Sequence, residues 1–265
     1  MPILEAAGLT KVYRRGASEV RAVDGINLSV GPGEFMAIMG RSGSGKTTLL
    51  DLLGCLLRPT DGELVIDGRS VIGASDGDLA RIRRERIGFV FQEFNLIPTL
   101  TAIENVVLPL RYGPRRPDGR QRATALLERV GLGGRLSHRP TELSGGEQQR
   151  VAIARSLIND PAVILADEPT GELDSATSEQ LMRTLRELNA DRNVTIIIVT
   201  HDAGIAGATD RVVRLQDGRV IADEQRGSRA FRDALAGGGS GRDASGGGER
   251  VWARLGGLLE RARGR

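Results

Sequence analysis

The sequence predicts an α/β fold with a mostly parallel sheet, an N-terminal antiparallel β subdomain and an inserted α-helical subdomain. Short apolar runs alternate with helical segments through much of the 265 residues, a pattern typical of a parallel sheet covered on both faces. The chain also opens with several β-like runs before its first helix. From about Thr101 to Asn159 strand signals vanish and helical ones dominate, which predicts that a helical block is inserted into the core.

The first third of the chain supplies the β-rich part. Residues 3–13, 18–30 and 33–39 carry β-like runs that are broken by Gly/Pro turns. Gly45–Leu57 follows as a helix with one apolar face. The remaining elements predicted here are, in order, a strand at Glu63–Ile66, a helix at Asp78–Arg86 and a strand at Ile87–Gln92.

The rest of the chain contains the helical block and the return to a parallel sheet. Gly119–Val130 and Glu147–Ile158 are the clear amphipathic segments of the block. A strand, a helix and a strand then follow at Ala162–Ala166, Ser175–Asn189 and Val194–Thr200. Two short strands, joined by the turn signal Asp217-Gly218, complete the fold at Arg211–Leu215 and Arg219–Ala222.

The composition is that of a folded globular protein, with 40% hydrophobic and 27% charged residues. No apolar run approaches the ~18 residues needed to cross a bilayer, and we expect no signal peptide at the start of the chain. The single cysteine, Cys55, excludes an internal disulfide framework and fits a reducing cytosol. The net charge of +3 comes from an arginine-rich tail, so the body has no basic excess that would indicate nucleic-acid binding.

Gly40–Thr47 reads GRSGSGKT and fits the phosphate-loop pattern G-x-x-x-x-G-K-[ST]. The motif lies between a β-like run and a helix start, which is the context it requires, so we predict a P-loop NTPase core. Glycines let backbone N–H groups surround the phosphates of ATP, and the helix start adds its positive end. The residues predicted to bind the nucleotide here, with the Thr47 hydroxyl also offered to Mg²⁺, are Gly40, Arg41, Ser42, Gly43, Ser44, Gly45, Lys46, Thr47 and Thr48.

Lys46 is one of only two lysines, beside Lys11, among 37 lysine and arginine residues. A compact ammonium group on a flexible stem can reach the phosphates as a point charge. A planar guanidinium is wider and would have to fit a loop that is already tight around the β- and γ-phosphates. The position therefore predicts a requirement for geometry as well as for charge.

A second cluster of polar residues follows a buried strand, where residues 162–168 read AVILADE. The strand places Asp167 and Glu168 at its carboxyl end, where open α/β sheets bind ligands. Beside a phosphate loop, Asp167 suits coordination of Mg²⁺ through water. Glu168 suits orienting or deprotonating an attacking water. Without the loop, two solvated carboxylates at a strand end would be the favoured interpretation.

Leu143–Arg150 reads LSGGEQQR and precedes a predicted helix, so Ser144, Gly145 and Gly146 form a second anion-binding helix start. Two such loops in one chain, together with ADEPTGELD, resemble the ATP-binding subunits of ABC transporters. The resemblance covers about residues 3–235 and includes the family's motifs in order.

The resemblance implies roles for three further residues. Tyr13 matches the aromatic residue that stacks on adenine, with a surface tyrosine at a strand end as the alternative. Gln92 matches the glutamine that senses Mg²⁺ and the attacking water, and the loop after it, Glu93–Thr101, matches the one that faces the membrane partner. His201, after a core strand, matches the histidine that contacts the γ-phosphate.

The resemblance also implies a dimer in which two chains sandwich two Mg-ATP. Each phosphate loop would then be completed by Ser144-Gly145-Gly146 of the other copy. Asp174 matches the loop that communicates across this dimer, although Gly171-Glu172 stands where the family often has serine-alanine. ATP-dependent closure and hydrolysis-dependent opening would drive a separate membrane permease, so we expect a cytoplasmic ATPase held at the inner face of the cell membrane.

The segment Phe91–Leu110, with EPTGELD and VTHD, is similar to the branch that serves lipoprotein release and macrolide or peptide export. The first hypothesis is therefore a transport ATPase. The alternative is a regulatory complex in which hydrolysis controls an extracellular cell-wall hydrolase. A third class, ATPases that work on DNA or ribosomes, usually has two ATPase domains or long coiled coils, and neither is visible here.

The chain is predicted to divide into an ATP-binding domain at 1–236, with its helical subdomain at about 101–160, a Gly/Ser-rich linker at 237–248 and a tail at 249–265. On a helix, the tail would have an apolar face and a flank of arginines, which suits an anionic membrane surface or a partner groove. The alternatives are a disordered tail or a helix that docks on this chain or its twin.

Overall fold

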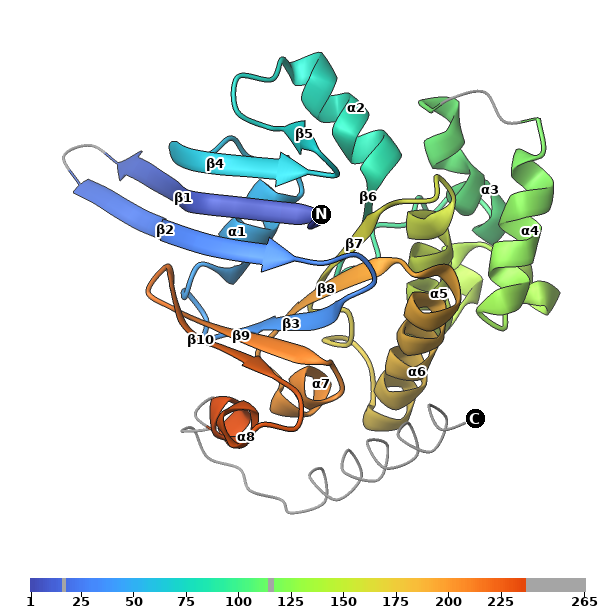
Figure 1. The fold of residues 1–265 in the computed structure, drawn as a ribbon. Helices are drawn as coiled ribbons and strands as arrows, with labels where there is room; N and C mark the ends of the chain where they lie inside the picture. The colour runs from blue at the N-terminus through green and yellow to red at the C-terminus, as the bar shows by residue number, and fades with distance from the viewer. Residues whose placement is uncertain (16–17, 114–116, 237–265) are drawn as a thin grey trace.

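Two β-sheets and several groups of helices make up the fold (Figure 1). The computed structural model describes residues 1–15, 18–113 and 117–236. The linker predicted at 237–248 and the tail predicted at 249–265 lie outside the described residues.

The smaller sheet is antiparallel and comes from the first third of the chain. Its strand order is β2-β1-β4-β5, and Leu4 of β1 lies opposite Val30 of β2 and Ile66 of β4. The inward-facing side chains at these positions are fully buried. The strands are β1 (Leu4–Arg15), β2 (Ser18–Val30), β4 (Asp61–Ile66) and β5 (Arg69–Ser70).

The larger sheet has the order β10-β9-β3-β8-β7-β6. Its strands pair in parallel, except that β10 pairs antiparallel with β9 at one edge. The carboxyl ends of the parallel strands therefore meet at one side of the sheet. The strands are β3 (Phe35–Met39), β6 (Ile87–Val90), β7 (Val163–Asp167), β8 (Thr195–Thr200), β9 (Arg211–Gln216) and β10 (Arg219–Gln225).

The larger sheet is covered on both faces, and β3 shows how. Met36 and Ile38 pack with α1 (Lys46–Leu53), α2 (Asp76–Arg86) and the antiparallel sheet. Phe35 points the other way, into the core formed with the helical part of the chain. The helices on that second face are α3 (Ala102–Val107), α4 (Gly119–Arg129), α5 (Gly145–Leu157), α6 (Ser175–Arg192), α7 (Ala203–Gly207) and α8 (Arg229–Ala236).

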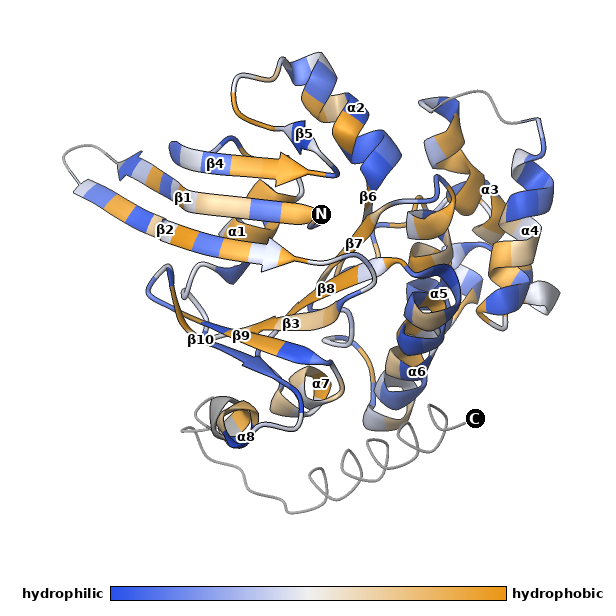
Figure 2. Cartoon of the chain, viewed as in Figure 1, coloured by the Kyte–Doolittle hydropathy of each residue, from blue (hydrophilic) through white to orange (hydrophobic). Residues whose placement is uncertain are grey.

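Hydropathy follows this layering (Figure 2). Strand β8 is mostly hydrophobic, whereas the edge strand β10 is mostly hydrophilic. Between Thr101 and Asn159 the described residues form helices, three short 3₁₀ turns at Leu108–Arg111, Gly133–Arg135 and Pro140–Glu142, and loops, without a strand. The α/β class, the antiparallel N-terminal sheet and the helical insertion are thus confirmed.

Several local features differ from the sequence prediction. Helix α1 ends at Leu53 and not at Leu57, because Gly54 packs against the ring of Phe89, 2.6 Å from where a Cβ would lie, and the next residue, Cys55, has φ 55°. Strand β6 is also two residues shorter than predicted. Helices α7 and α8 were not predicted; α7, at five residues, is too short to give a strong periodic signal.

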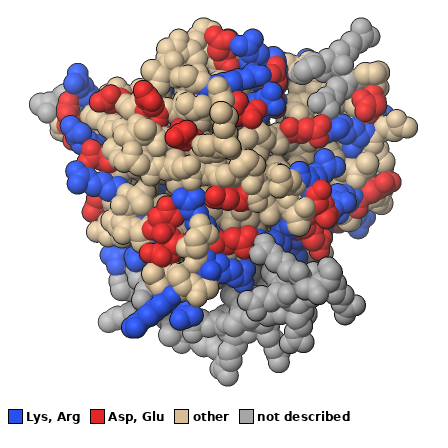
Figure 3. Space-filling model, in the orientation of Figure 1, with Lys and Arg blue, Asp and Glu red and all other residues tan. Residues whose placement is uncertain are grey.

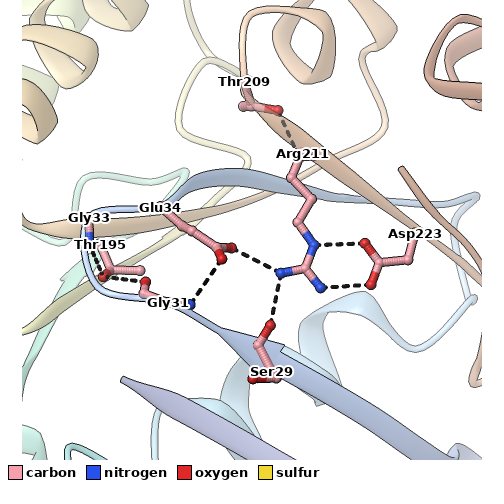
Figure 4. A network of polar contacts seen from close by, with 8 residues as sticks. All are labelled: Ser29, Gly31, Gly33, Glu34, Thr195, Thr209, Arg211 and Asp223. Atoms are coloured by element: carbon pink, nitrogen blue, oxygen red, sulfur yellow. Dashed lines mark hydrogen bonds and ion pairs between the residues drawn. The ribbon is translucent and has the colours of Figure 1, made fainter. Parts of the chain in front are cut away.

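Arg211 joins the two sheets (Figure 4). From β9, its guanidinium donates two parallel hydrogen bonds of 2.7 Å to the Asp223 carboxylate on β10. Its Nη1 also donates to the Ser29 carbonyl on β2, at 2.8 Å, and to Glu34 Oε2 just before β3, at 2.9 Å. These carboxylates raise the pKa of Arg211. One nearly buried side chain of β9 therefore contacts strands β10 and β2 and the turn between β2 and β3.

The surface carries charges of both signs (Figure 3). Basic and acidic side chains are interspersed over the face drawn in Figure 3, so this face has no large area of one sign. Among the described residues, no helix has both the length and the hydropathy needed to cross a membrane.

Candidate functional site

The phosphate loop connects β3 to α1 and is held from two sides. Gly45 has φ 97°, and a Cβ there would lie 2.1 Å from the Ala22 carbonyl of β2. A Cβ at Gly40 would lie 2.5 Å from the Leu215 carbonyl of β9. Only glycine fits such close backbone approaches. The Gly218 N–H of the β9–β10 hairpin donates to the Ser44 carbonyl at 3.0 Å, so this hairpin also holds the loop.

Two polar side chains of this loop, Lys46 and Ser44, are hydrogen-bond donors. The Lys46 ammonium donates to the carbonyls of Gly40, at 2.8 Å, and Arg41, at 3.0 Å. Burial lowers the pKa of Lys46, and the nearby Glu168 and Asp167 oppose this shift. The buried Ser44 hydroxyl has no hydrogen-bond partner among the described residues. Both groups are donors that a phosphate could accept from.

A cavity of about 1200 Å³ opens beside the loop. It brings together residues that are far apart in the sequence and that the motifs predict to act on ATP. Tyr13, Asp167, Asp174 and Ser144–Gly146 are not among the residues that line it. The lining is formed by Ala22, Met39, Gly40–Thr48, Gln92, Glu168, Gly171, His201 and Arg214–Asp217.

Glu168 follows β7 and has a left-handed backbone, with φ 42°. Its N–H donates to the Val199 carbonyl at 2.9 Å. Its Oε1 lies 2.8 Å from His201 Nδ1, and its Oε2 accepts from the Thr200 hydroxyl at 3.1 Å. Both carboxylate oxygens are thus held by the end of β8. Thr200 was not predicted, although its place directly before His201, at the end of a buried strand, is a signal that could have found it.

Asp167 directly precedes Glu168 and is the last residue of β7. Burial, then repulsion from Glu168 and Asp51, raises the pKa of Asp167. Burial also raises the pKa of Asp51 on α1. Half-buried carboxylates close together favour a bound cation, so the Asp167 carboxylate and the Thr47 hydroxyl fit the oxygen ligands that Mg²⁺ prefers. Asp51 was not predicted, but it lies four residues after Thr47, on the same face of the helix.

Gln92 lies on the loop after β6 and borders the same cavity. Its Nε2 donates to Glu172 Oε1 at 3.3 Å. Glu172 belongs to the Gly171-Glu172 pair at which the sequence departs from the family pattern. The loop that carries Gln92 thus contacts the segment that leads to Asp174. Asp174 itself is the N-cap of α6, and the Thr177 hydroxyl and N–H lower its pKa by donating to it.

Ser144, Gly145 and Gly146 begin α5, on the opposite face of the larger sheet from α1. Ser144 and Glu147 form a capping box: Glu147 N–H donates to the Ser144 hydroxyl at 3.3 Å, and Glu147 Oε2 accepts from Ser144 N–H at 2.8 Å. The N–H groups of Gly145 and Gly146 lie in the first turn, where they have no intrahelical partner, so they are able to donate to an anion. The second anion-binding helix start is therefore intact but does not border the cavity.

Tyr13 lies on β1 with 41% of its surface exposed. The Lys11 ammonium is 5.5 Å from the centre of its ring and donates to the Arg58 carbonyl at 2.7 Å. An exposed ring with a nearby cation can still stack on a base. The role of Tyr13 in binding adenine stays a prediction.

Comparisons with known proteins add family information. The family model described as "ABC transporter" matches residues 23–171. The chain is 52% identical over 223 residues to the macrolide export ATP-binding/permease protein MacB of Syntrophobacter fumaroxidans, covering 83% of this chain and 31% of the relative. It is 50% identical to the ABC transporter ATP-binding protein YvrO of Bacillus subtilis, covering 84% of this chain and 97% of the relative. The chain thus spans about a third of the length of the MacB relative.

Among solved structures, the chain is similar to the dimeric post-hydrolysis state of the ATP-binding cassette MJ0796 bound to ADP and Pi. The TM-score is 0.77 and the identity 46%, with 85% of this chain and all of that chain covered. A dimeric structure of MJ0796, a bacterial ABC transporter cassette, matches equally well.

Proposed function

Because the chain belongs to the ABC transporter family, we propose that it is the ATP-hydrolysing subunit that drives a membrane permease. ATP binding and hydrolysis follow from the family. The finer proposal is that Lys46, Gln92, Glu168 and His201 carry out the reaction. The observation that supports it best is that these four side chains, from four separate parts of the sequence, border one cavity.

In this proposal the loop residues bind the phosphates of ATP, and Lys46 exchanges its two loop carbonyls for phosphate oxygens. Glu168, whose carboxylate borders the cavity, orients a water molecule and takes its proton. His201 contacts the γ-phosphate and holds Glu168 through the 2.8 Å contact. Catalysis is then mostly positioning and electrostatics, as in other phosphoryl-transfer sites.

Mg²⁺ would be held by Thr47 and Asp167, with Gln92 beside it. The bound ion would neutralise charge on the phosphates. The fit rests on the Asp167 carboxylate, whose pKa is raised by burial and by its acidic neighbours. A cation at that position would offset the repulsion between these carboxylates.

We further propose that two copies of the chain form the complete site. Ser144, Gly145 and Gly146 do not border the cavity of their own chain, yet they form a helix start whose first-turn N–H groups can donate to an anion. The dimeric MJ0796 cassette bound to ADP and Pi is a precedent at 46% identity. Two chains would then enclose two ATP molecules.

The partner and the cargo are proposed from the relatives. The MacB relative is named for macrolide export and combines an ATP-binding part with a permease, so we propose an export-type permease, with the chain at the inner face of the membrane. Isolating the chain from membranes and identifying the membrane protein that accompanies it tests this. A partner with a large extracellular hydrolase-binding region would instead support the regulatory alternative.

Glu168→Gln tests the ATPase mechanism and the dimer together. We expect this variant to bind ATP, to lose steady-state hydrolysis, and to show a dimer mass in size-exclusion chromatography with light scattering when ATP is present. Normal turnover would contradict the role of Glu168.

Gly145→Asp in the Glu168→Gln background is the matched control. A Cβ at Gly145 meets only ordinary contacts, the nearest being Leu173 and Phe94 at 3.6 Å, and an acidic residue in the first helical turn is favourable. The added carboxylate would repel the phosphate of the other chain. We expect this double variant to bind ATP as a monomer; a dimer of unchanged stability would contradict the composite site.

A further inference from the structure

Thr200 is a fully buried threonine at the end of β8. Its hydroxyl makes two hydrogen bonds of different kinds. It donates to Glu168 Oε2 at 3.1 Å and accepts from the Asp202 N–H at 3.0 Å. A hydroxyl with both a donor and an acceptor partner has one fixed orientation.

The two contacts to the Glu168 carboxylate differ in rigidity. The His201 side chain that contacts Oε1 is 72% exposed, so its position depends on what else it binds. Thr200 is fully buried, and its branched side chain has few rotamers. Thr200 is therefore the fixed contact of the carboxylate, and His201 the adaptable one.

The Glu168 backbone shows why a fixed contact matters. Its φ of 42° is a left-handed conformation that is unfavourable for a non-glycine residue. Such a conformation persists when its surroundings hold it. The Glu168 N–H donates to the Val199 carbonyl, and the Glu168 carboxylate accepts from the Thr200 hydroxyl. Two consecutive residues of β8 therefore hold both the backbone and the side chain of Glu168.

Asp202 extends this arrangement to the turn that carries His201. Its carboxylate accepts from the N–H groups of Gly204 and Ile205 and caps α7. Its own N–H donates to Thr200. The Thr200 hydroxyl thus connects Glu168, just after β7, with the start of α7, so it ties Glu168 to the turn that carries His201.

We propose that Thr200 is a positioning residue for ATP hydrolysis: its hydroxyl orients the Glu168 carboxylate toward the attacking water. It acts through Glu168 and does not bind the nucleotide. The inference rests on the proposed function, in which Glu168 takes the proton from that water. It gives a role to the threonine of the VTHD segment, for which the sequence predicted none.

The test compares Thr200→Val with Thr200→Ser in the full chain. Valine keeps the shape of threonine but replaces the hydroxyl by a methyl group, whereas serine keeps the hydroxyl. For Thr200→Val we expect kcat for Mg-ATP hydrolysis to fall about 10- to 100-fold, because a slightly misplaced catalytic group costs that much. The KM for ATP and the Kd of a non-hydrolysable ATP analogue should stay within about twofold of wild type.

Thr200→Ser should retain kcat within about threefold of wild type, since it can make both hydrogen bonds. A Thr200→Val chain with wild-type kcat would overturn the inference. So would a loss of ATP affinity that parallels the loss of kcat, or a serine variant as slow as the valine variant, because either result indicates a purely structural role. Failure of the proposed function looks different: wild type and Thr200→Ser would then bind ATP and hydrolyse none.

Discussion

Lys46 lies where its ammonium group already contacts two loop carbonyls. These hydrogen bonds show the length and direction that the loop can accommodate. An incoming phosphate would replace the carbonyls as acceptor without a change in the loop. A guanidinium is planar and presents its donors in a rigid fork. It therefore cannot repeat the geometry of the Lys46 ammonium inside the phosphate loop.

Lys46→Arg is therefore expected to weaken ATP binding at least about tenfold and to reduce kcat about 100-fold or more, the range for losing one donor to a reacting group. Nucleotide titration and a phosphate-release assay measure the two effects. Lys11→Arg is the matched control, since it makes the same change at the only other lysine and arginine can also lie over the Tyr13 ring. If Lys46→Arg turns over like wild type, charge alone is sufficient at this position.

At the scale of the elements, α5 begins with a capping box that has two functions. Ser144 and Glu147 satisfy each other's N–H groups, and the same helix start is the proposed contact for the other chain's ATP. The Ser144 backbone N–H, by donating to it, lowers the pKa of Glu147, with Arg135 adding a smaller contribution. The charge on Glu147 thus stabilises the helix before any ligand binds.

Glu147→Gln keeps the capping box, because glutamine can accept the same hydrogen bond, but it removes the charge. A carboxyl whose pKa is lowered by folding contributes stability above its unfolded pKa, and this contribution is lost as the pH falls through its folded pKa. We expect wild type to be more stable at pH 7, by about 0.3–1 kcal/mol at low salt, and the difference to vanish below about pH 4.

Urea unfolding at a series of pH values measures this difference, with the change Glu63→Gln at an exposed position of β4 as the control. A difference between wild type and Glu147→Gln that stays constant from neutral to acidic pH would contradict an electrostatic origin.

The sequence predicted elements better than their ends and their connections. The phosphate loop, Asp167-Glu168 and the helix start at Ser144 were predicted because each has a fixed local spacing. Where α1 ends depends on Gly54 meeting Phe89 across the core, a contact that no local pattern encodes. Helix α7 is five residues long, less than two helical turns, so it carries almost no periodic signal.

Arg155 illustrates contacts between elements that local patterns do not predict. It belongs to α5, and its guanidinium donates to the carbonyls of Phe94 and Asn95, on the loop after Gln92. Both of these residues have positive φ angles, and burial lowers the pKa of Arg155. A charged side chain of α5 thus holds a loop with a strained backbone, and only the tertiary structure brings the helix and the loop together.

At the scale of the whole molecule, Arg211 holds the two sheets in one arrangement (Figure 4). The antiparallel sheet supplies Tyr13 and the Ala22 carbonyl that faces the phosphate loop, whereas the larger sheet supplies Glu168 and His201. Arg211 contacts Ser29 of the first sheet and Asp223 of the second. The relative position of these two parts of the proposed nucleotide site depends on this network.

Arg211→Met is expected to lower the free energy of unfolding by about 2–4 kcal/mol, because Asp223 and Glu34 lose their partner. The value lies at the low end of the range for buried pairs, since both carboxylates are partly exposed. Chemical unfolding measures it.

Arg219→Met is the matched control, because it breaks an exposed pair with Asp24 and should cost less than about 1 kcal/mol. If both variants lose the same small amount of stability, Arg211 does not hold the sheets together.

The scarcity of lysine has a practical consequence for chemistry on this protein. Reagents that acylate primary amines can react only at the N-terminus, Lys11 and Lys46. Lys46 borders the large cavity, so a small acylating reagent can reach it while the cavity is empty, whereas a bound phosphate would shield it. The extent of labelling at Lys46, read by peptide mass spectrometry, would then report nucleotide occupancy in the unmodified wild-type chain, including within a membrane complex where no engineered probe is present.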